Sequence, residues 1–192
     1  MKQTNTEKWK TSLQALKDGN RKYLNARTSG GDISPEKRLH AFKNGQAPYA
    51  VVVSCSDSRV LPESIFFAGI GDLFVIRVAG NVTDGIALGS IEYALSHLKT
   101  PLVVVLGHTC CGAVNAAIKG GACGNITMIT DKIRLAISGE RDDCYASRLN
   151  VEAEVNAIKK ALAKANLCAE TIGAIYRTDT GEVEFLENSE NL

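Results

Sequence analysis

One short apolar run constrains the fold more than any other part of the chain. Residues 102–106 read Leu-Val-Val-Val-Leu, so a strand here is apolar on both faces. Such strands are typical of the interior of a parallel sheet, where other elements cover both faces. Residues 49–54 and 73–78 are also rich in apolar and β-branched residues and predict two more strands. Apolar residues at helical spacing predict helices at 7–25, 85–98 and 126–137, and a long one through 151–162 to about Ala165. Ser34 as an N-cap and Pro35 in the first turn predict a short helix through about Lys43, and a helix that starts at Gly112 is ended by Gly120-Gly121.

The C-terminal part of the chain predicts a hairpin. Residues 171–176 and 182–186 are strand-like, and Asp179-Thr180-Gly181 between them is a turn sequence. Strands that alternate with helices predict an α/β fold. We expect a mostly parallel central sheet with flanking helices and a C-terminal hairpin strand.

Length and composition indicate an ordinary globular chain. It has 192 residues, of which 45% are apolar and 22% charged, which is enough for one substantial core. We therefore expect residues 1–192 to form a single catalytic domain. Its N-terminal helical arm is expected at about 7–43 and its α/β core at about 48–187.

Charge and the N-terminal sequence limit the expected partners. A net charge of +1 gives no reason to expect nucleic acid or an anionic membrane as a partner. The first residues lack the apolar stretch of a secretory signal, and no apolar run approaches the roughly 18 residues of a membrane span. We therefore expect a cytoplasmic protein whose six cysteines are reduced, some of them serving as metal ligands.

Two short segments carry most of the functional information. Cys55 directly follows the strand predicted at 49–54, and His108 to Cys111 follow the strand predicted at 102–106. The carboxyl ends of parallel strands lie at one edge of a sheet, where ligands bind. Two thiolates and one neutral imidazole bind zinc and leave a fourth position open. The sequence therefore predicts one Zn²⁺ per chain at Cys55, His108 and a cysteine of the second segment.

Cys110 and Cys111 are both candidates for that last ligand. Cys111 is favoured because it lies three residues after His108, a spacing that places two side chains on one side of a turn. Cys110 is then expected to point away and to pack as a small apolar residue. Two alternatives remain: three buried core residues without a metal, and a Cys55–His108 hydrolytic pair that leaves Cys111 without a role. The other cysteines have no ligand-like spacing and are expected to be structural: Cys123, Cys144 and Cys168.

Asp57 and Arg59 supply polar groups beside the first thiol. Both lie at two-residue spacing from Cys55, so an extended segment would project all three side chains to one side. Arg59 can hold a carboxylate through two hydrogen bonds and keep it ionised. An aspartate held in this way can accept a hydrogen bond from a metal-bound water or bind the metal itself.

With these segments in place, the chain closely resembles the β-class carbonic anhydrases over about residues 10–187. The motifs that carry the resemblance are Cys55-Ser-Asp-Ser-Arg-Val60, Gly71-Asp-Leu-Phe-Val-Ile-Arg77, Ala79-Gly-Asn81, Ser90-Ile-Glu-Tyr-Ala94, Gly107-His-Thr-Cys-Cys-Gly-Ala113, Gly173-Ala-Ile-Tyr176 and Thr180-Gly-Glu-Val-Glu-Phe185.

The resemblance implies an activity and an assembly. It implies zinc held by Cys55, His108 and Cys111, with Asp57 and Arg59 as a catalytic dyad. The implied reaction is the reversible hydration of carbon dioxide to bicarbonate and a proton through zinc-bound hydroxide. The family's active site lies at a dimer interface, so a homodimer or a higher even-numbered homo-oligomer is implied.

The resemblance also implies a substrate pocket and a subtype. Gln46 and the Gly112 N–H match groups that hydrogen-bond the substrate, and the apolar pocket would be lined by Phe74, Ala79 and Tyr93. A Trp stands three residues before the first cysteine ligand in the subtype with a non-catalytic bicarbonate site, and here that position is Val52. Together with Gln46, this favours the plant-like, constitutively open subtype, in which Asp57 does not bind zinc at rest.

Two other functions fit the same residues. The scaffold can hydrolyse carbonyl sulfide or carbon disulfide, and pocket shape would decide between these substrates and carbon dioxide. A non-catalytic zinc protein is the second alternative, but such a protein is expected to lack the Asp57–Arg59 pair or Gln46.

Overall fold

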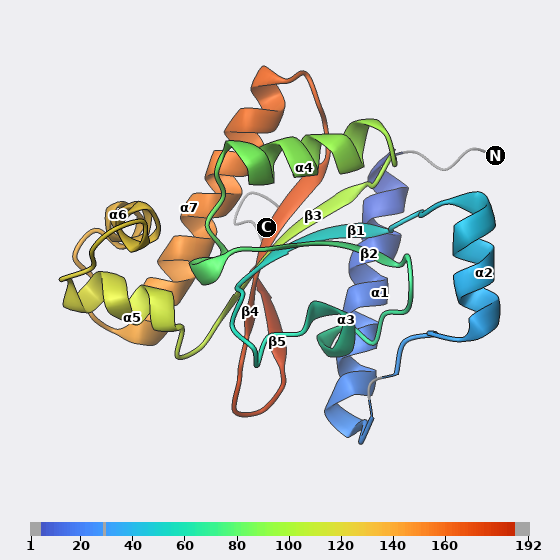
Figure 1. Cartoon of the computed structure of the whole chain (residues 1–192), viewed down its shortest axis with the longest axis horizontal. Coiled ribbons are helices and arrows are strands. Elements are labelled where there is room, and N and C mark those ends of the chain that lie inside the picture. Colours follow the sequence, from blue (N-terminus) through green and yellow to red (C-terminus); the bar gives the residue numbers. More distant parts are fainter. Residues whose placement is uncertain (1–4, 29, 187–192) are drawn as a thin grey trace.

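A five-stranded sheet forms the centre of the computed structural model, which describes residues 5–28 and 30–186 (Figure 1). The strand order is β2-β1-β3-β4-β5. The first four of these strands are parallel, and β5 pairs antiparallel with β4, which confirms the predicted parallel sheet with its hairpin strand. The strands are β1 (Ala50–Ser54), β2 (Leu73–Arg77), β3 (Leu102–His108), β4 (Glu170–Tyr176) and β5 (Val183–Leu186).

Helices alternate with these strands along the chain. Among the described residues, two short elements were not predicted as helices, α3 and the 3-10 turn η1, because four and three residues are too few to show a helical period. The helix α7 also begins earlier than its apolar spacing indicated, at Asp143, where Asp142 caps it. The helices are α1 (Asn5–Asn25), α2 (Pro35–Asn44), α3 (Pro62–Ile65), the 3-10 turn η1 (Ala79–Asn81), α4 (Gly85–Ser96), α5 (Gly112–Lys119), α6 (Ile126–Ile137) and α7 (Asp143–Lys164).

The two faces of the sheet have separate cores. Val51 and Val53 of β1 face α4 and α7, whereas Ala50 and Val52 face α1. This alternation follows from the two-residue period of a strand. All seven residues of β3 are buried, as expected for a strand covered on both faces.

The helix α7 packs unusually close to the sheet. A Cβ atom at Gly107 of β3 would lie 2.4 Å from a methyl of Val151, and one at Gly173 of β4 would lie 2.7 Å from the other. Only glycine allows this approach at both positions. The contact brings the first three turns of α7 beside the carboxyl ends of the strands, where they reach the functional site.

The carboxyl ends of β1 and β3 form the switch point of the sheet. The chain leaves β1 through α3 on the α1 face and enters β2, whereas it leaves β3 through α5, α6 and α7 and enters β4. Since these two adjacent connections diverge, a crevice opens between them, and ligands of such sheets bind there.

The N-terminal helices differ in how they pack. The helix α1 lies across the sheet, and Leu16 on it is fully buried. The helix α2 stands apart from the sheet and buries none of its residues (Figure 1). It starts as predicted, with Pro35 in its first turn and the Ser34 hydroxyl accepting a hydrogen bond from the Lys37 N–H at 3.1 Å. Across the described ranges, no helix has both the length and the apolar composition needed to cross a bilayer.

Candidate metal centre

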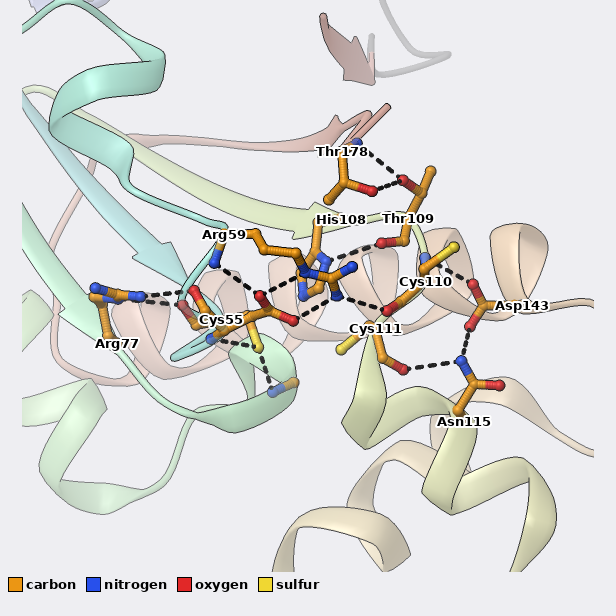
Figure 2. Close-up of polar contacts among 12 residues, drawn as sticks. Cys55, Arg59, Arg77, His108, Thr109, Cys110, Cys111, Asn115, Asp143 and Thr178 are labelled. Carbon is orange, nitrogen blue, oxygen red and sulfur yellow. Dashed lines mark hydrogen bonds and ion pairs between the residues drawn. The ribbon is translucent and has the colours of Figure 1, made fainter. Parts of the chain in front are cut away.

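Cys55, His108 and Cys111 meet at the switch point. Cys55 directly follows β1, His108 is the last residue of β3, and Cys111 is the residue that caps α5. Their ligand atoms all lie within 4.8 Å of one another, and the three residues are at most 4% exposed. Figure 2 shows the sulfur atoms of Cys55 and Cys111 directed toward the same space. Thr109 and Cys110 form a turn that connects β3 to α5, and this turn brings His108 and Cys111 together.

The His108 ring presents a free lone pair to this space. Its Nδ1 lies 3.0 Å from the Thr109 carbonyl oxygen, which can only accept, so Nδ1 carries the proton. The neutral ring therefore has its lone pair on Nε2. This atom is buried and has no hydrogen-bond partner among the described residues. A buried polar atom of this kind needs a partner, and a metal ion supplies one.

The two thiols influence each other through the one proton that lies between them. The backbone N–H groups of Gly80 and Asp57 point at Cys55 Sγ from 3.2 and 3.4 Å. The Cys111 thiol and these two amides lower the pKa of Cys55 to about 4, although burial opposes the shift. The remaining proton stays on Cys111, whose pKa is raised because it donates to the Cys55 thiolate and is itself buried.

This donor set fits zinc. A dication between the sulfur atoms removes the repulsion that keeps the second proton on Cys111, so both thiols can bind as thiolates. Two thiolates and a neutral imidazole with a fixed tautomer are typical zinc ligands, and three protein ligands leave a position for water or substrate.

Asp57 and Arg59 form a bidentate ion pair beside the thiols. Arg59 Nε lies 2.9 Å from Asp57 Oδ1, and Nη2 lies 2.7 Å from Oδ2. The Arg59 backbone N–H also donates to Oδ1 at 2.9 Å. These hydrogen bonds hold the pKa of the Asp57 carboxyl well below its usual range. The extended segment that we predicted here is wrong: a turn closed by Val60 N–H and Asp57 O at 2.9 Å brings the pair together.

Arg77 supports the same loop and was not singled out from the sequence. It ends β2, opposite Ser54 of β1. Its Nη2 donates to the Asp57 carbonyl at 2.9 Å and its Nε to the Cys55 carbonyl at 3.3 Å. The signals in the sequence are its position at the end of a strand and its place in the Gly71–Arg77 motif, and its role depends on β2 lying next to β1.

Cys110 lies in the ligand turn with its side chain outside the metal centre. The residue has a φ of 56°, and its sulfur points away from those of Cys55 and Cys111 (Figure 2). Its backbone is fixed on both sides, since its N–H donates to Asp143 Oδ2 at 2.8 Å and its carbonyl accepts from Arg59 Nη2 at 3.1 Å. The prediction that Cys110 packs as a small apolar residue is wrong, because the residue is exposed. The remaining cysteines are exposed as well: Cys123, Cys144 and Cys168.

The residues predicted for a substrate pocket fall into two groups. Gly112 begins α5 and Ala79 begins η1, both next to the metal centre. Phe74 instead pairs with Val51, so it lies about 13 Å along the sheet from Cys55, four residues at about 3.3 Å each. The Tyr93 ring lies 6.3 Å from that of Phe74, and Gln46 is exposed in the loop before β1. Within one chain, these three side chains lie away from the metal ligands.

A buried Cys-His-Cys centre at the switch point of a parallel sheet, with an ion-paired aspartate beside it, defines a metal-dependent α/β enzyme. Residues 50–183 match the model of the carbonic anhydrase family, which is well over half of the chain. The protein belongs to the carbonic anhydrase family, and its fold is that of the β class.

Individual relatives agree with this assignment. Carbonic anhydrase 2 of Mycobacterium tuberculosis is 37% identical over 196 aligned positions, which cover 93% of each chain. A carbonic anhydrase of Mycolicibacterium smegmatis is 48% identical over 55% of this chain and 50% of its own length. Among solved structures, a β-carbonic anhydrase of Coccomyxa in complex with acetazolamide has a TM-score of 0.69 and 28% identity, covering 79% of this chain and 78% of that one. One of two tetrameric β-carbonic anhydrases of Sordaria macrospora has a TM-score of 0.67 and 27% identity, covering 80% and 89%.

Proposed function

We propose that this protein catalyses the zinc-dependent, reversible hydration of carbon dioxide to bicarbonate and a proton. The observation that carries this proposal is the buried Cys55-His108-Cys111 group with the unpaired Nε2 of His108 aimed into it. When bound, zinc supplies a Lewis acid that activates water for attack on an electrophilic carbon.

Asp57 orients the attacking water. A carboxylate has about four lone-pair sites, and Arg59 occupies two on Oδ1 and one on Oδ2. Oδ2 therefore keeps one site that can accept a hydrogen bond from the water. Because Asp57 stays ionised, it accepts this hydrogen bond throughout the working pH range, and Arg59 fixes the direction of the acceptor.

The amino end of α5 stabilises the product oxygens. The first N–H groups of a helix have no acceptor within the helix and attract negative charge. Gly112 is the first residue of α5 and follows the ligand Cys111 directly, so its N–H is free to donate to a developing bicarbonate oxygen.

We further propose that two copies of the chain complete each active site, as a homodimer or a higher even-numbered oligomer. Gln46, Phe74 and Tyr93 lie too far from the metal ligands of their own chain to contact the same small substrate. The elements near them present apolar surface: Phe42 of α2 is 87% exposed and Leu39 is 53% exposed. Burial of such a patch against a second copy is the expected use of an apolar surface, and it brings Gln46 to the partner's zinc.

A subunit-complementation experiment tests this shared site. Asp57→Ala and Gln46→Ala should each lower hydration by at least about tenfold, because each removes a polar group that orients reactants. Coexpression of the two variants should restore about a quarter of wild-type activity, since half of randomly formed dimers are mixed and each mixed dimer has one intact site. Coexpressed activity no higher than the mean of the two variants would show that Gln46 acts within its own chain.

The subtype, the domain organisation and the location are also part of the proposal. Both oxygens of Asp57 are engaged by Arg59, which supports the plant-like subtype in which Asp57 does not bind zinc at rest. The packing of Leu16 of α1 on the sheet supports one catalytic domain over 1–192, with an arm at about 7–43 and a core at about 48–187. Six free cysteines support a reducing compartment such as the cytoplasm.

Stopped-flow carbon dioxide hydration together with zinc analysis tests the activity itself. We expect about one zinc per chain, as three ligands at one site dictate, and hydration that is lost when a chelator removes the metal. Sulfide release from carbonyl sulfide and carbon disulfide should be measured on the same preparation. Full zinc content with sulfide release and no hydration would assign the scaffold to those substrates, and full zinc with neither reaction would indicate a non-catalytic zinc protein.

A further inference from the structure

Two buried polar residues on α7 are used neither as ligands nor in the reaction described above. Asn150 and Glu154 are each 1% exposed and lie one helical turn apart, so they face the same way. Burial of an amide or a carboxylate costs free energy unless it is hydrogen-bonded. Both residues hydrogen-bond to one short segment, residues 80–83, which connects β2 to α4.

Asn150 binds the segment at the residue that contacts the metal centre. Its Nδ2 donates to the Gly80 carbonyl at 2.9 Å, while the Gly80 N–H donates to Cys55 Sγ at 3.2 Å. Its Oδ1 has no hydrogen-bond partner within the described residues. The hydrogen bond to the Gly80 carbonyl is therefore the polar contact that this buried side chain makes. One side chain of α7 is thus connected to a zinc ligand through a single residue.

Gly80 cannot easily move or be replaced. Its φ of 68° and ψ of 18° lie in the left-handed region, which favours glycine. A Cβ atom would lie 2.7 Å from Ile133 Cδ1 and 3.0 Å from Ala113 Cβ. With α5 and α6 packed against it on one side, the hydrogen bond from Asn150 holds the peptide plane that follows Gly80, and the Gly80 N–H lies in the plane directly before it.

A second anchor holds the other end of the segment. Glu154 Oε2 accepts from the Thr83 N–H at 3.0 Å and from the Thr83 hydroxyl at 2.6 Å. Lys132 of α6 lies 2.9 Å from Glu154 Oε1 and also donates to the Thr83 carbonyl, so the buried carboxylate is paired. The segment is therefore fixed at both ends, and the Gly80 amide has little freedom to leave the sulfur atom.

We infer that Asn150 is a positioning residue of the metal centre, which holds the Gly80 amide on the Cys55 thiolate and thereby sets how much charge that thiolate donates to the metal. A hydrogen bond to a thiolate stabilises its lone pairs and weakens it as a donor. A weaker donor leaves the metal a stronger Lewis acid, and hydrogen bonds to sulfur ligands tune metal centres in this way. The inference rests on the proposed function, since it requires Cys55 to be a ligand of the catalytic metal.

The cobalt-substituted protein gives a readout that a purely structural role would not change. Asn150→Leu is expected to keep about one cobalt per chain while the thiolate-to-cobalt charge-transfer band moves to longer wavelength, because a thiolate without its hydrogen bond gives up an electron more easily. With zinc, kcat should fall by about tenfold, the lower end of the effect of losing an outer partner of a ligand.

Asn20→Leu is the matched control. Asn20 of α1 is 6% exposed and donates to the carbonyls of Ile65 and Gly181 at 3.2 and 2.9 Å, on the opposite face of the sheet. It also accepts from the Val183 N–H at 3.0 Å, so its loss leaves more backbone groups unpaired and should lower the unfolding temperature at least as much. The cobalt band and kcat of this variant should remain those of the wild type.

The possible failures are distinguishable. An Asn150→Leu protein with an unchanged cobalt band and unchanged kcat overturns the inference, whatever its stability. If that variant does not fold, Asn150→Ser is read by the same criteria, since its hydroxyl is too short to reach the Gly80 carbonyl. A wild-type protein without a thiolate-to-cobalt band overturns the metal assignment as well, whereas a wild-type band with an unchanged variant overturns the positioning role alone.

Discussion

Replacement of Cys111 by serine is expected to abolish zinc binding and carbon dioxide hydration together, whereas the same change at Cys110 should leave both intact. Cys111 is 1% exposed and places its sulfur in the group within 4.8 Å. A serine hydroxyl remains protonated near neutral pH and is a poor zinc ligand. Loss of a direct ligand should weaken zinc binding by more than the 10- to 100-fold effect of losing a partner outside the ligand shell, that is, by more than about 100-fold.

The neighbouring thiol makes this comparison sharp. Cys110 contributes only its backbone to the centre, through the Asp143 and Arg59 hydrogen bonds, and its side chain is exposed. The measurements are zinc per chain after dialysis against a chelator and the hydration rate of each variant. Zinc loss in Cys110→Ser with retention in Cys111→Ser would reverse the ligand assignment and require the turn after β3 to rotate.

The strands and the candidate metal ligands show which features local sequence can predict. The run from 102 to 106 identified β3, and the segments at the carboxyl ends of β1 and β3 contained all three candidate metal ligands, because parallel strands bring these ends together. The hairpin was also local, since its turn residues lie between two strand-like runs. These features depend on strand period and direction alone.

The supporting residues depend on packing and could not be identified in this way. Arg77 reaches the Cys55 loop because β2 pairs with β1, and Asp143 reaches Cys110 because α7 packs on Gly107. Asn150 acts through a residue 70 positions earlier in the chain. The Asp57–Arg59 pair was expected from the correct residues but for the wrong reason, because a turn and not an extended segment brings them together.

Asp57→Asn is expected to lower kcat for hydration by about 100-fold or more while zinc content stays at the wild-type level. The substitution keeps the size of the side chain but removes the charge that Arg59 pairs with. An amide nitrogen in place of one carboxylate oxygen also cannot accept a hydrogen bond from the attacking water. Since the ligand atoms of Cys55, His108 and Cys111 remain in place, turnover should fall far more than metal content.

Asp131→Asn is the matched control, because Asp131 is also ion-paired with an arginine, Arg134, at 2.7 Å, but on the exposed surface of α6. Surface pairs of this kind contribute little to stability, so this variant should keep wild-type turnover and zinc. Stopped-flow hydration at several buffer concentrations, with metal analysis of each preparation, separates the two variants. A full kcat in Asp57→Asn would remove the aspartate from the reaction and leave the ion pair only the task of holding the Cys110 carbonyl through Arg59. Parallel losses of zinc and kcat would instead show that Asp57 acts by supporting the ligand Cys55. The backbone N–H of Asp57 donates to the Cys55 sulfur at 3.4 Å.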